Sequence, residues 1–366
     1  MKNREKFLFV IPSLNVGGAE RVVAHLINHI DREKYIPELL LINNTRHNYL
    51  KDLRKDILVT YLNVPLKTKY FFIKTLIAII KLKPDIVFVG LSGINVLLSP
   101  FLPFFRKIRW VARETSTISK HVKNKRMLFL YRHFYKNYDI LIAQSKTMAN
   151  DLFFNFHVPK KKIQIINNPL DTDFIDKKCS EESVVSFPKG KINLLVCGGI
   201  KPVKGYDTLI RRFSKLSNLE KYHLTVIGNT QDQEYKESLL SFISEKGLNQ
   251  YISFKGHQEN SFQWMKEADI LISSSQYEGF PNVVLEALYC GTPVLINNYG
   301  VAKEIITDGV NGYIFDFNKR NFEEKLMATL KCSFISDKIS RDTKKKYAIE
   351  KIMKKYELVF DELKQA

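Results

Sequence analysis

The chain has 366 residues, of which 45% are hydrophobic and 26% are charged. This length and composition exclude a disordered or fibrous chain and predict a globular protein of two domains. Its four cysteines are widely spread, which excludes a disulfide framework or a zinc site built on paired cysteines and favours a reducing cytoplasm.

The first residues, MKNREKFLFVIPSL, contain a short apolar run without a small-residue cleavage site. We interpret this run as a first strand and not as a signal peptide. No uninterrupted apolar stretch approaches the length that spans a bilayer. The sequence therefore predicts a cytoplasmic protein.

Positive charge is concentrated in the first half of the chain. Residues 1–172 contain 29 Lys and Arg against 12 Asp and Glu, a net charge of +17, whereas residues 173–366 contain 28 against 26, a net charge of +2. Such a basic half attracts nucleic acid, an anionic membrane surface or a phosphorylated substrate. Charge alone does not choose among these partners.

Apolar, strand-like runs alternate with helix-like patterns through the first half, in the order 6–14, 19–30, 37–43, 74–83, 85–90, 108–114 and 139–145. Strands that alternate with helices predict a parallel sheet covered on both faces. We therefore predict a doubly wound α/β domain over residues 1–172.

The second half repeats this alternation and predicts a second doubly wound domain over residues 188–342. Between the two domains, the polar segment 173–190 ends in Pro188 and Gly190 and is typical of a linker. A final helix within 343–366 has apolar residues at helical spacing and should pack on the first domain. Ligands of such sheets bind beyond the carboxyl ends of the strands, so we expect a functional cleft between two facing domains.

The stretch YEGFPNVVLEALYCGTPV, residues 277–294, contains two glutamates, Glu278 and Glu286, and the second lies among apolar and small residues. Pro281 suits the start of a helix and Gly291 suits the position just past its end, which predicts a helix over about 281–290. The residues around Glu286 are apolar on every side, so its carboxylate should be buried, which is costly unless the carboxylate is hydrogen-bonded or functional. A ribose could satisfy it, and Glu278 would lie near helix amides that suit phosphate oxygens. Alternatively, the two glutamates cap and solvate a surface helix.

The stretch and its flanks, SSSQYEGFP and GVAKEIITDGVNGYIF, resemble the signature of retaining GT-B glycosyltransferases of the family-4 type, also called glycosyl transferases group 1. Four further motifs match in the same order: NVGGAERVV, DILIAQSKTMANDL, KIQIINNPLDTDF and KGYDTLI. The resemblance covers nearly the whole chain. It implies two facing Rossmann-like domains with a cleft between them.

The resemblance also implies roles for individual residues. Glu286 would hold the ribose hydroxyls of a nucleotide-sugar donor, and Glu278 would contact the sugar and act in catalysis. Lys204 would neutralise the diphosphate as it leaves, a role that grows in the transition state. Gly17 and Gly18 would form a first-domain loop over the donor, although they could also form an ordinary tight turn, and Lys204 could be a surface lysine. The remaining donor contacts implied are Gly279, Phe280, Pro281, Asn282 and Val283.

The sequence departs from the family pattern in two places. Gly199 stands where an arginine usually lies, and Lys201 is the nearest substitute as a phosphate-binding cation. Glu114 stands at a strand end where many relatives carry a histidine. Glu114 could orient an acceptor hydroxyl or accept its proton, or it could pair with Arg113 or Arg109, whereas His121 is interpreted as a surface residue.

No metal site and no cofactor are predicted. Asp171 and Asp173 spell the DxD of metal-dependent transferases of another fold, but here they lie in a loop between the domains. Helix amides and Lys204 can replace a divalent cation as the source of positive charge.

The basic first half suggests a partner. Segments 67–83 and 97–110 mix aromatic, aliphatic and cationic residues as in segments that lie on anionic membranes, or they are core helices with solvated lysines. Nucleic acid is not expected, because none of the usual readout motifs is present.

We therefore expect a metal-independent hexosyl- or N-acetylhexosaminyltransferase that moves a sugar, with retention, from a nucleotide diphosphate donor such as a UDP-sugar. The acceptor would be a glycan or a lipid-linked acceptor in the assembly of a polysaccharide, lipopolysaccharide or capsule. The enzyme would be cytoplasmic, on the inner face of the membrane. A same-fold sugar-nucleotide epimerase or hydrolase and a non-catalytic protein that binds anionic surfaces are the alternatives.

Overall fold

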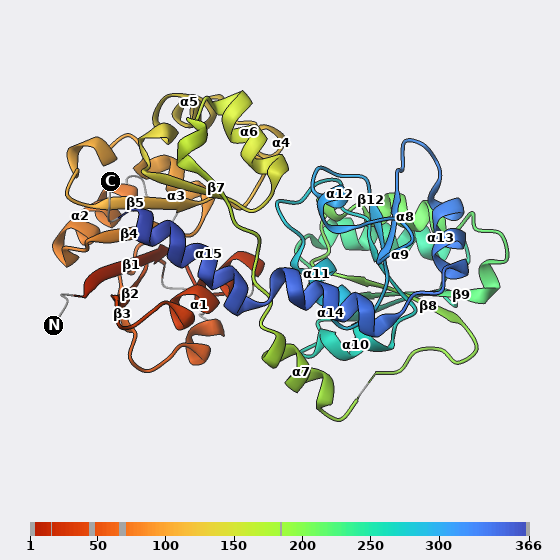
Figure 1. The fold of residues 1–366 in the computed structure, drawn as a ribbon. Helices are drawn as coiled ribbons and strands as arrows, with labels where there is room; N and C mark the ends of the chain where they lie inside the picture. The colour runs from red at the N-terminus through yellow and green to blue at the C-terminus, as the bar shows by residue number, and fades with distance from the viewer. Residues whose placement is uncertain (1–3, 16, 44–47, 66–70, 184, 364–366) are drawn as a thin grey trace. The chain divides into compact units, whose positions relative to one another are not determined.

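The computed structural model describes residues 4–363 except 16, 44–47, 66–70 and 184 (Figure 1). The chain forms two compact units, each described by itself below. Unit 1 comprises Met1–Pro169 and Ile349–Ala366, and unit 2 comprises Leu170–Ala348.

Unit 1 contains a seven-stranded parallel sheet with the strand order β3-β2-β1-β4-β5-β6-β7. Residues 7–11 of β1, an interior strand of this sheet, are almost completely buried, as expected for a strand covered on both faces. The strands are β1 (Glu5–Ile11), β2 (Tyr35–Leu41), β3 (Leu58–Tyr61), β4 (Ile86–Val89), β5 (Arg109–Arg113), β6 (Ile140–Ala143) and β7 (Ile163–Ile165).

Helices cover both faces of this sheet. One core contains side chains of α1 and α15, and the other contains side chains of α2, α3, α5 and α6. The helices are α1 (Gly18–His29), α2 (Phe71–Leu82), α3 (Ser92–Leu98), α4 (Ile118–His121), α5 (Lys125–Phe134), α6 (Lys146–Phe156) and α15 (Ile349–Glu362), with short 3₁₀ turns η1 (Asn48–Asp52), η2 (Leu102–Phe104), η3 (Tyr135–Asn137) and η4 (Lys160–Lys162).

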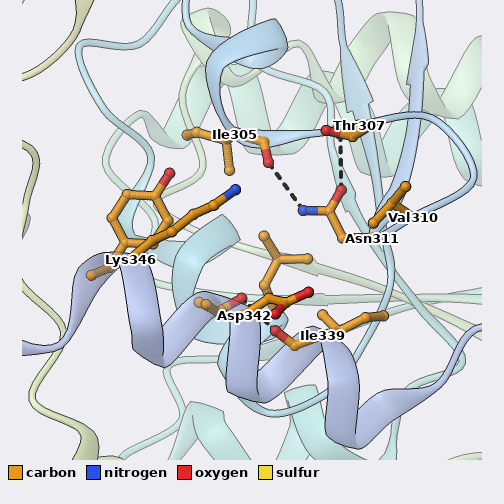
Figure 2. A pocket seen from close by; sticks show the side chains of 10 residues that line it. Ile305, Thr307, Val310, Asn311, Ile339, Asp342 and Lys346 are labelled. Atoms are coloured by element: carbon orange, nitrogen blue, oxygen red, sulfur yellow. Dashed lines mark hydrogen bonds between the residues drawn. The ribbon is translucent and has the colours of Figure 1, made fainter.

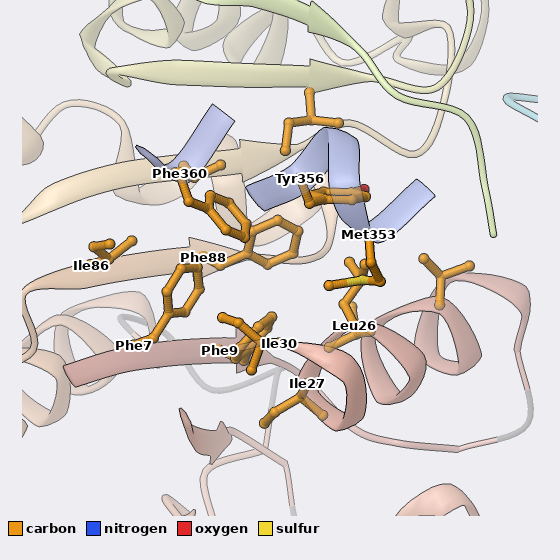
Figure 3. Close-up of a cluster of buried hydrophobic side chains, with 14 of the residues drawn as sticks. Phe7, Phe9, Leu26, Ile27, Ile30, Ile86, Phe88, Met353, Tyr356 and Phe360 are labelled. Atoms are coloured by element: carbon orange, nitrogen blue, oxygen red, sulfur yellow. The ribbon is translucent and has the colours of Figure 1, made fainter. Parts of the chain in front are cut away.

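The last helix, α15, contributes an aromatic cluster to unit 1. Its Phe360 ring lies 4.8 Å from the ring of Phe7 in β1, and its Tyr356 ring lies 6.2 Å from that of Phe88 in β4. Figure 3 shows the Phe360 ring directed toward Phe7 and Phe88, and the Met353 side chain beside Leu26 of α1. The C-terminal segment is therefore part of the hydrophobic core of the domain that the N-terminus begins.

Unit 2 contains a six-stranded parallel sheet with the order β10-β9-β8-β11-β12-β13. Its strands are β8 (Ile192–Cys197), β9 (Tyr222–Ile227), β10 (Ile252–Gly256), β11 (Ile270–Ser273), β12 (Val294–Asn297) and β13 (Gly312–Phe315). Its helices are α7 (Thr172–Ser180), α8 (Tyr206–Phe213), α9 (Gln233–Glu245), α10 (Ser261–Glu267), α11 (Asn282–Tyr289), α12 (Ala302–Ile305), α13 (Phe322–Lys331) and α14 (Ser336–Tyr347), with 3₁₀ turns η5 (Pro202–Lys204) and η6 (Leu219–Lys221).

Two sheets of this kind confirm the predicted α/β class with two doubly wound domains. Among the described residues, none of the helices has both the length and the apolar character needed to cross a membrane. The parallel strands also place the functional loops, because every strand in a sheet ends at the same edge.

The segment 173–190, which we expected to be a linker, begins with a helix in the structure. Residues 172–180 form α7, with the Asp171 carboxylate capping it by accepting a hydrogen bond from Phe174 N at 3.0 Å. Ile175 is buried in the core of unit 2. The high polarity of this segment concealed a helix that buries only a narrow face.

A single helix within 343–366 is also not what the structure shows. The chain is helical in α14 up to Tyr347, extended at Ala348 and helical again in α15. The Tyr347 carbonyl accepts a hydrogen bond from Leu170 N at 2.8 Å, so it does not continue the helical ladder. Leu170 is the first residue of unit 2 and Ala348 is the last. These two residues form a β-bridge with each other.

Candidate active site

The strand order of unit 2 defines where a ligand should bind. The chain runs outward from β8 through β9 to β10, then returns to β11 beside β8 and runs outward in the other direction. The loops after β8 and β11 therefore diverge at the carboxyl edge of the sheet. This is the switch point at which doubly wound sheets bind ligands.

Lys204 and Glu278 come together at this switch point. Lys204 follows β8, Glu278 follows β11, and the distance between Lys204 Nζ and Glu278 Oε1 is 2.6 Å. Ser275 Oγ donates a second hydrogen bond to the same oxygen at 2.6 Å. Burial alone would raise the pKa of Glu278, but the charge and hydrogen bond of Lys204, together with Ser275, hold this pKa below its usual range. The carboxylate is therefore ionised and held in place.

The loop after β11 is fixed to the loop after β8 by two hydrogen bonds to backbone carbonyl groups. Ser274 Oγ donates to the Lys204 carbonyl at 2.7 Å, and Gln276 N donates to the Val203 carbonyl at 2.9 Å. Gly205 lies between them with φ +66°, and a Cβ there would be 2.5 Å from the Ser274 carbonyl oxygen. Only glycine fits this close approach.

A third strand end supports Glu278. The side chain of Asn297, the last residue of β12, donates from Nδ2 to the Ser275 carbonyl at 3.0 Å in a buried position. Ser275 thus contacts Asn297 through its backbone and Glu278 through its hydroxyl. Sequence reasoning did not identify Ser274, Ser275 or Asn297, although a polar residue directly after an apolar strand was an available signal.

Lys201 lies near the ion pair as a second cation. Burial lowers the pKa of Lys201, and the nearby positive charge of Lys204 lowers it further, whereas Glu278 raises it. At Gly199, a Cβ would lie 2.7 Å from the Gln231 side chain, so Gln231 occupies the space beside this glycine. The cations of this loop are Lys201 and Lys204.

Helix α11 agrees with the prediction from its sequence. Pro281 is its N-cap, and Gly291 follows its end with φ +85°. Glu286 is only 3% exposed, among buried residues of the same helix, which confirms the predicted burial of its carboxylate and makes a solvated surface helix untenable.

The other predicted donor residues surround the start of α11. Gly279, Phe280 and Pro281 are buried, whereas Asn282 and Val283 are partly exposed. The ring of Phe280 lies 5.9 Å from that of Tyr347 at the end of α14. The turn that carries these backbone groups is thus packed against the last helix of its own unit.

In unit 1, Gly17 is the N-cap of α1 and Gly18 is the first residue of that helix. The φ of Gly17 is −170°, an extended conformation open to any residue, so the backbone conformation at this position does not require a glycine. A Cβ on Gly17 would lie 2.1 Å from Glu20 Oε2. Burial raises the pKa of Glu20, while its own backbone and then Arg113 lower it.

Glu114 is completely buried at the end of β5 and has several hydrogen-bond donors. Tyr135 OH donates to its Oε2 at 2.7 Å, and Oε1 accepts from Ser92 Oγ, Thr115 N and Ser116 N. Burial raises the pKa of Glu114, although these donors lower it. This geometry does not support the predicted contact with an acceptor hydroxyl, because the lone pairs face donors of unit 1.

The predicted pairing of Glu114 with Arg109 is wrong, because Arg109 pairs with Glu5. Arg113 is 1% exposed and donates from Nη2 to Asn168 Oδ1 at 2.6 Å. Burial lowers the pKa of Arg113, while Tyr356, Glu114 and Glu20 raise it. Arg113 and Glu114 therefore belong to one buried polar network.

The structure also places His121 and the DxD sequence, to which the sequence analysis assigned no catalytic role. His121 is exposed at the end of α4, as expected. Asp171 caps α7, which gives the DxD sequence a structural explanation. Within the part of the chain that the structure describes, no group of three or more His, Cys, Asp or Glu side chains is arranged to hold a metal ion.

A separate pocket of unit 2 lies between α14 and the 307–311 turn (Figure 2). In Figure 2, Asn311 Nδ2 donates to the Ile305 carbonyl at 3.0 Å, and Asn311 Oδ1 accepts from Thr307 N at 2.9 Å. These groups hold the turn itself. None of the predicted donor-binding residues lines this pocket.

Both halves of the chain match known family descriptions. Residues 16–174 match "Glycosyltransferase Family 4", and residues 180–350 match "Glycosyl transferases group 1". The two matches follow each other along the chain and together include the predicted site residues.

One similar protein is the N-acetylgalactosamine-N,N'-diacetylbacillosaminyl-diphospho-undecaprenol 4-alpha-N-acetylgalactosaminyltransferase of Campylobacter jejuni, 27% identical over 359 residues that cover 93% of each chain. Another is the lipopolysaccharide core biosynthesis glycosyltransferase LpsE of Rhizobium meliloti, 22% identical with 82% of this chain and 81% of LpsE covered.

Solved structures show the same fold. Anabaena Alr3699/HepE in complex with UDP superposes with a TM-score of 0.80 at 18% identity, covering 98% of this chain and 100% of that one. A glycosyltransferase from Rickettsia africae also gives a TM-score of 0.80 at 19% identity, with 99% of each chain covered.

Proposed function

Since the chain belongs to the GT-B glycosyltransferases of the group 1 and family 4 type, we propose that it transfers a sugar from a UDP-sugar to a lipid-linked or glycan acceptor. Transfer would retain the anomeric configuration and contribute to a cell-surface glycan. The transferred sugar would be a hexose or an N-acetylhexosamine. The observation that carries this proposal is the Lys204–Glu278 ion pair at the switch point of unit 2.

The donor diphosphate would bind at the loop after β8. Lys204 and Lys201 supply positive charge there, and the amides at the start of α11 add the partial positive charge of a helix N-terminus. These groups stabilise the negative charge that grows on the leaving diphosphate. They support a reaction without a metal, and the corresponding test is full activity in the presence of a chelator.

Glu286 would accept hydrogen bonds from the two ribose hydroxyls of the donor. A buried carboxylate costs little once polar groups satisfy it, and a ribose provides two donors in adjacent positions. Gly279, Phe280, Pro281, Asn282 and Val283 would line the donor through the turn before and at the start of α11.

Glu278 would change partner during the reaction. In the structure its carboxylate is paired with Lys204, so the site contains a balanced pair of charges. Binding of a diphosphate would draw Lys204 to the phosphate oxygens and release Glu278 toward the sugar hydroxyls. The acceptor would then attack on the face from which the diphosphate leaves, with water excluded.

We keep Gly17 and Gly18 as proposed donor contacts of unit 1. For Glu114 we propose a supporting role at the end of β5, because its oxygens already accept hydrogen bonds from Tyr135, Ser92 and neighbouring amides. No side chain of the chain acts as a covalent nucleophile in this scheme. The protein positions both substrates and stabilises charge.

The function is tested by incubating the protein with a panel of sugar nucleotides, with and without a bacterial lipid extract. Release of nucleotide only in the presence of acceptor, with a glycosylated product in the mass spectrum, is the expected result. Release without acceptor would favour the hydrolase or epimerase. Absence of both binding and release would contradict an enzymatic role.

A further inference from the structure

Helix α2 exposes apolar side chains on the face that points away from the core. Its Thr75, Leu76 and Ile79 are buried against the sheet of unit 1. Ile73, Ile77 and Ile80 are 39%, 47% and 37% exposed. Their spacing of four and three residues places them in one stripe along the outer face. A helix at the surface of a water-soluble protein normally has one apolar stripe, which faces the core. Helix α2 has a second apolar stripe, which faces outward.

An exposed aromatic turn borders this helix. The ring of Phe101 lies 5.8 Å from that of Phe72, which joins the start of α2 to the η2 turn. In this turn Phe104 is 79% exposed, the most exposed large apolar side chain among the described residues. The isoleucine stripe and Phe104 together form what we call the α2 surface.

Cations accompany the apolar side chains of the α2 surface. The exposed basic residues are Lys74, Lys81, Lys83, Arg106 and Lys107. Neither residues 71–83 nor residues 99–109 contain an Asp or a Glu. Apolar side chains flanked by lysines and arginines, without acids, are the pattern of helices that lie in the interface of an anionic bilayer.

We propose that the α2 surface binds the headgroup region of an anionic lipid membrane. The isoleucines and Phe104 would enter the boundary of the acyl chains, and the lysines and arginines would contact lipid phosphates. A purely ionic partner such as nucleic acid would leave the isoleucine stripe in water, whereas a lipid surface buries it. Membrane docking is independent of the sugar chemistry and extends the proposed function by bringing the enzyme to a lipid-linked acceptor.

The test is sedimentation of the full chain with vesicles of phosphatidylcholine, with or without phosphatidylglycerol. We expect binding to the vesicles that contain phosphatidylglycerol and much weaker binding to the others. Replacing both Ile77→Asp and Phe104→Asp should lower vesicle affinity by about tenfold or more. Lys74→Glu and Lys81→Glu should each lower it by roughly fivefold and weaken its dependence on salt.

Leu358→Asp provides the matched control. Leu358 is 65% exposed on α15, which packs on the other face of the same sheet. This variant should bind vesicles as the wild type does. Failure of the wild type to bind phosphatidylglycerol vesicles, or an equal loss in Leu358→Asp, would overturn the proposal.

Stabilisation by UDP separates this proposal from the catalytic one. Each variant should keep the increase in melting temperature that UDP causes, which shows that it is folded and that unit 2 is intact. If the proposed function were wrong, UDP would fail to stabilise the wild type while vesicle binding persisted.

Discussion

Lys204 and Glu278 form an ion pair between the loops that follow β8 and β11, with Nζ and Oε1 2.6 Å apart. These are the two adjacent strands at which the order of the unit 2 sheet reverses. The sequence separates the two residues by 74 positions, and the sheet brings them together at the place where parallel sheets bind ligands. The pair connects the fold to the proposed chemistry and generates the first predictions.

Removing the lysine should abolish most of the activity. We expect Lys204→Ala to lower kcat/KM by about a hundredfold or more, because a cation directed at the leaving group acts mainly in the transition state. Lys246→Ala is the control, since Lys246 forms an exposed pair with Glu245 at 2.9 Å in the same unit. Equal activity of the two variants in a nucleotide-release assay would exclude Lys204 from catalysis.

Ser275 should act as a positioning residue for Glu278. Its hydroxyl donates to Glu278 Oε1 at 2.6 Å, and Asn297 holds its backbone. We expect Ser275→Ala to lower kcat by roughly tenfold with little change in the KM for donor, since one strong hydrogen bond to a charged group is lost. Ser275→Thr keeps the hydroxyl and should restore kcat.

Ser214→Ala serves as the control for this experiment. Ser214 is a serine of unit 2 whose hydroxyl donates a hydrogen bond to the Arg211 carbonyl at 3.1 Å, at an exposed position. A tenfold loss in Ser214→Ala as well would show that the effect of Ser275→Ala is not specific. Failure of Ser275→Thr to recover activity would indicate that packing, and not the hydrogen bond, matters at this position.

The lowered pKa of Glu278 predicts a particular pH dependence of stability. The pKa of Glu278 in the folded state lies below the ordinary value of 4.5. At pH values between the folded and the unfolded pKa, the folded state therefore binds fewer protons than the unfolded state. The stabilisation by this carboxylate is therefore complete above the unfolded pKa and is lost as the pH falls through the folded pKa. Urea unfolding without nucleotide measures this contribution as the difference between wild type and Glu278→Gln.

We expect this difference in unfolding free energy to be constant from neutral pH down to roughly one pH unit above the unfolded pKa, and to shrink only below it. A difference that already changes between neutral pH and that point would mean that the carboxyl has a raised pKa. Lys204 would then not be its partner in solution.

The C-terminal helix should be essential to the stability of unit 1. Phe360 is 2% exposed and its ring contacts those of Phe7, Tyr35 and Phe88. Phe360→Ala should lower the free energy of unfolding by about 3–5 kcal/mol, the usual cost of removing a buried aromatic ring. Leu358→Ala on the same helix should have little effect, because Leu358 is largely exposed. Similar values for the two variants in denaturant titrations would contradict the packing of α15.

Much of the fold could be predicted from the sequence, because strands buried on both faces leave continuous apolar runs. The runs at 85–90 and 139–145, for example, contain β4 and β6. The burial of Glu286 was also predictable, since residues 283–285 and 287–288 on either side of it are apolar. Helix α7 was not, because its composition is polar and only residues such as Ile175 are buried.

The site was predicted less completely than the fold. Glu278, Lys204 and Glu286 were proposed from their motif, and the structure pairs Glu278 with Lys204 and buries Glu286. The contacts of Ser275 and Asn297 could not be predicted, because they join three strand ends. The hydrogen-bond donors around Glu114 were equally unpredictable, because Ser92 of α3 and Tyr135 of η3 are more than 20 positions away from Glu114 in the sequence. The break at Ala348 depends on a hydrogen bond from Leu170, which no local pattern contains.

The most direct measurement is a calorimetric titration of UDP into the wild type and into Glu286→Ala, with Glu324→Ala, an exposed glutamate of α13, as control. The account predicts that the wild type and Glu324→Ala bind UDP, whereas Glu286→Ala remains folded but shows no measurable binding. Binding of UDP to Glu286→Ala with the affinity of the wild type would contradict the assignment of the buried carboxylate to the ribose.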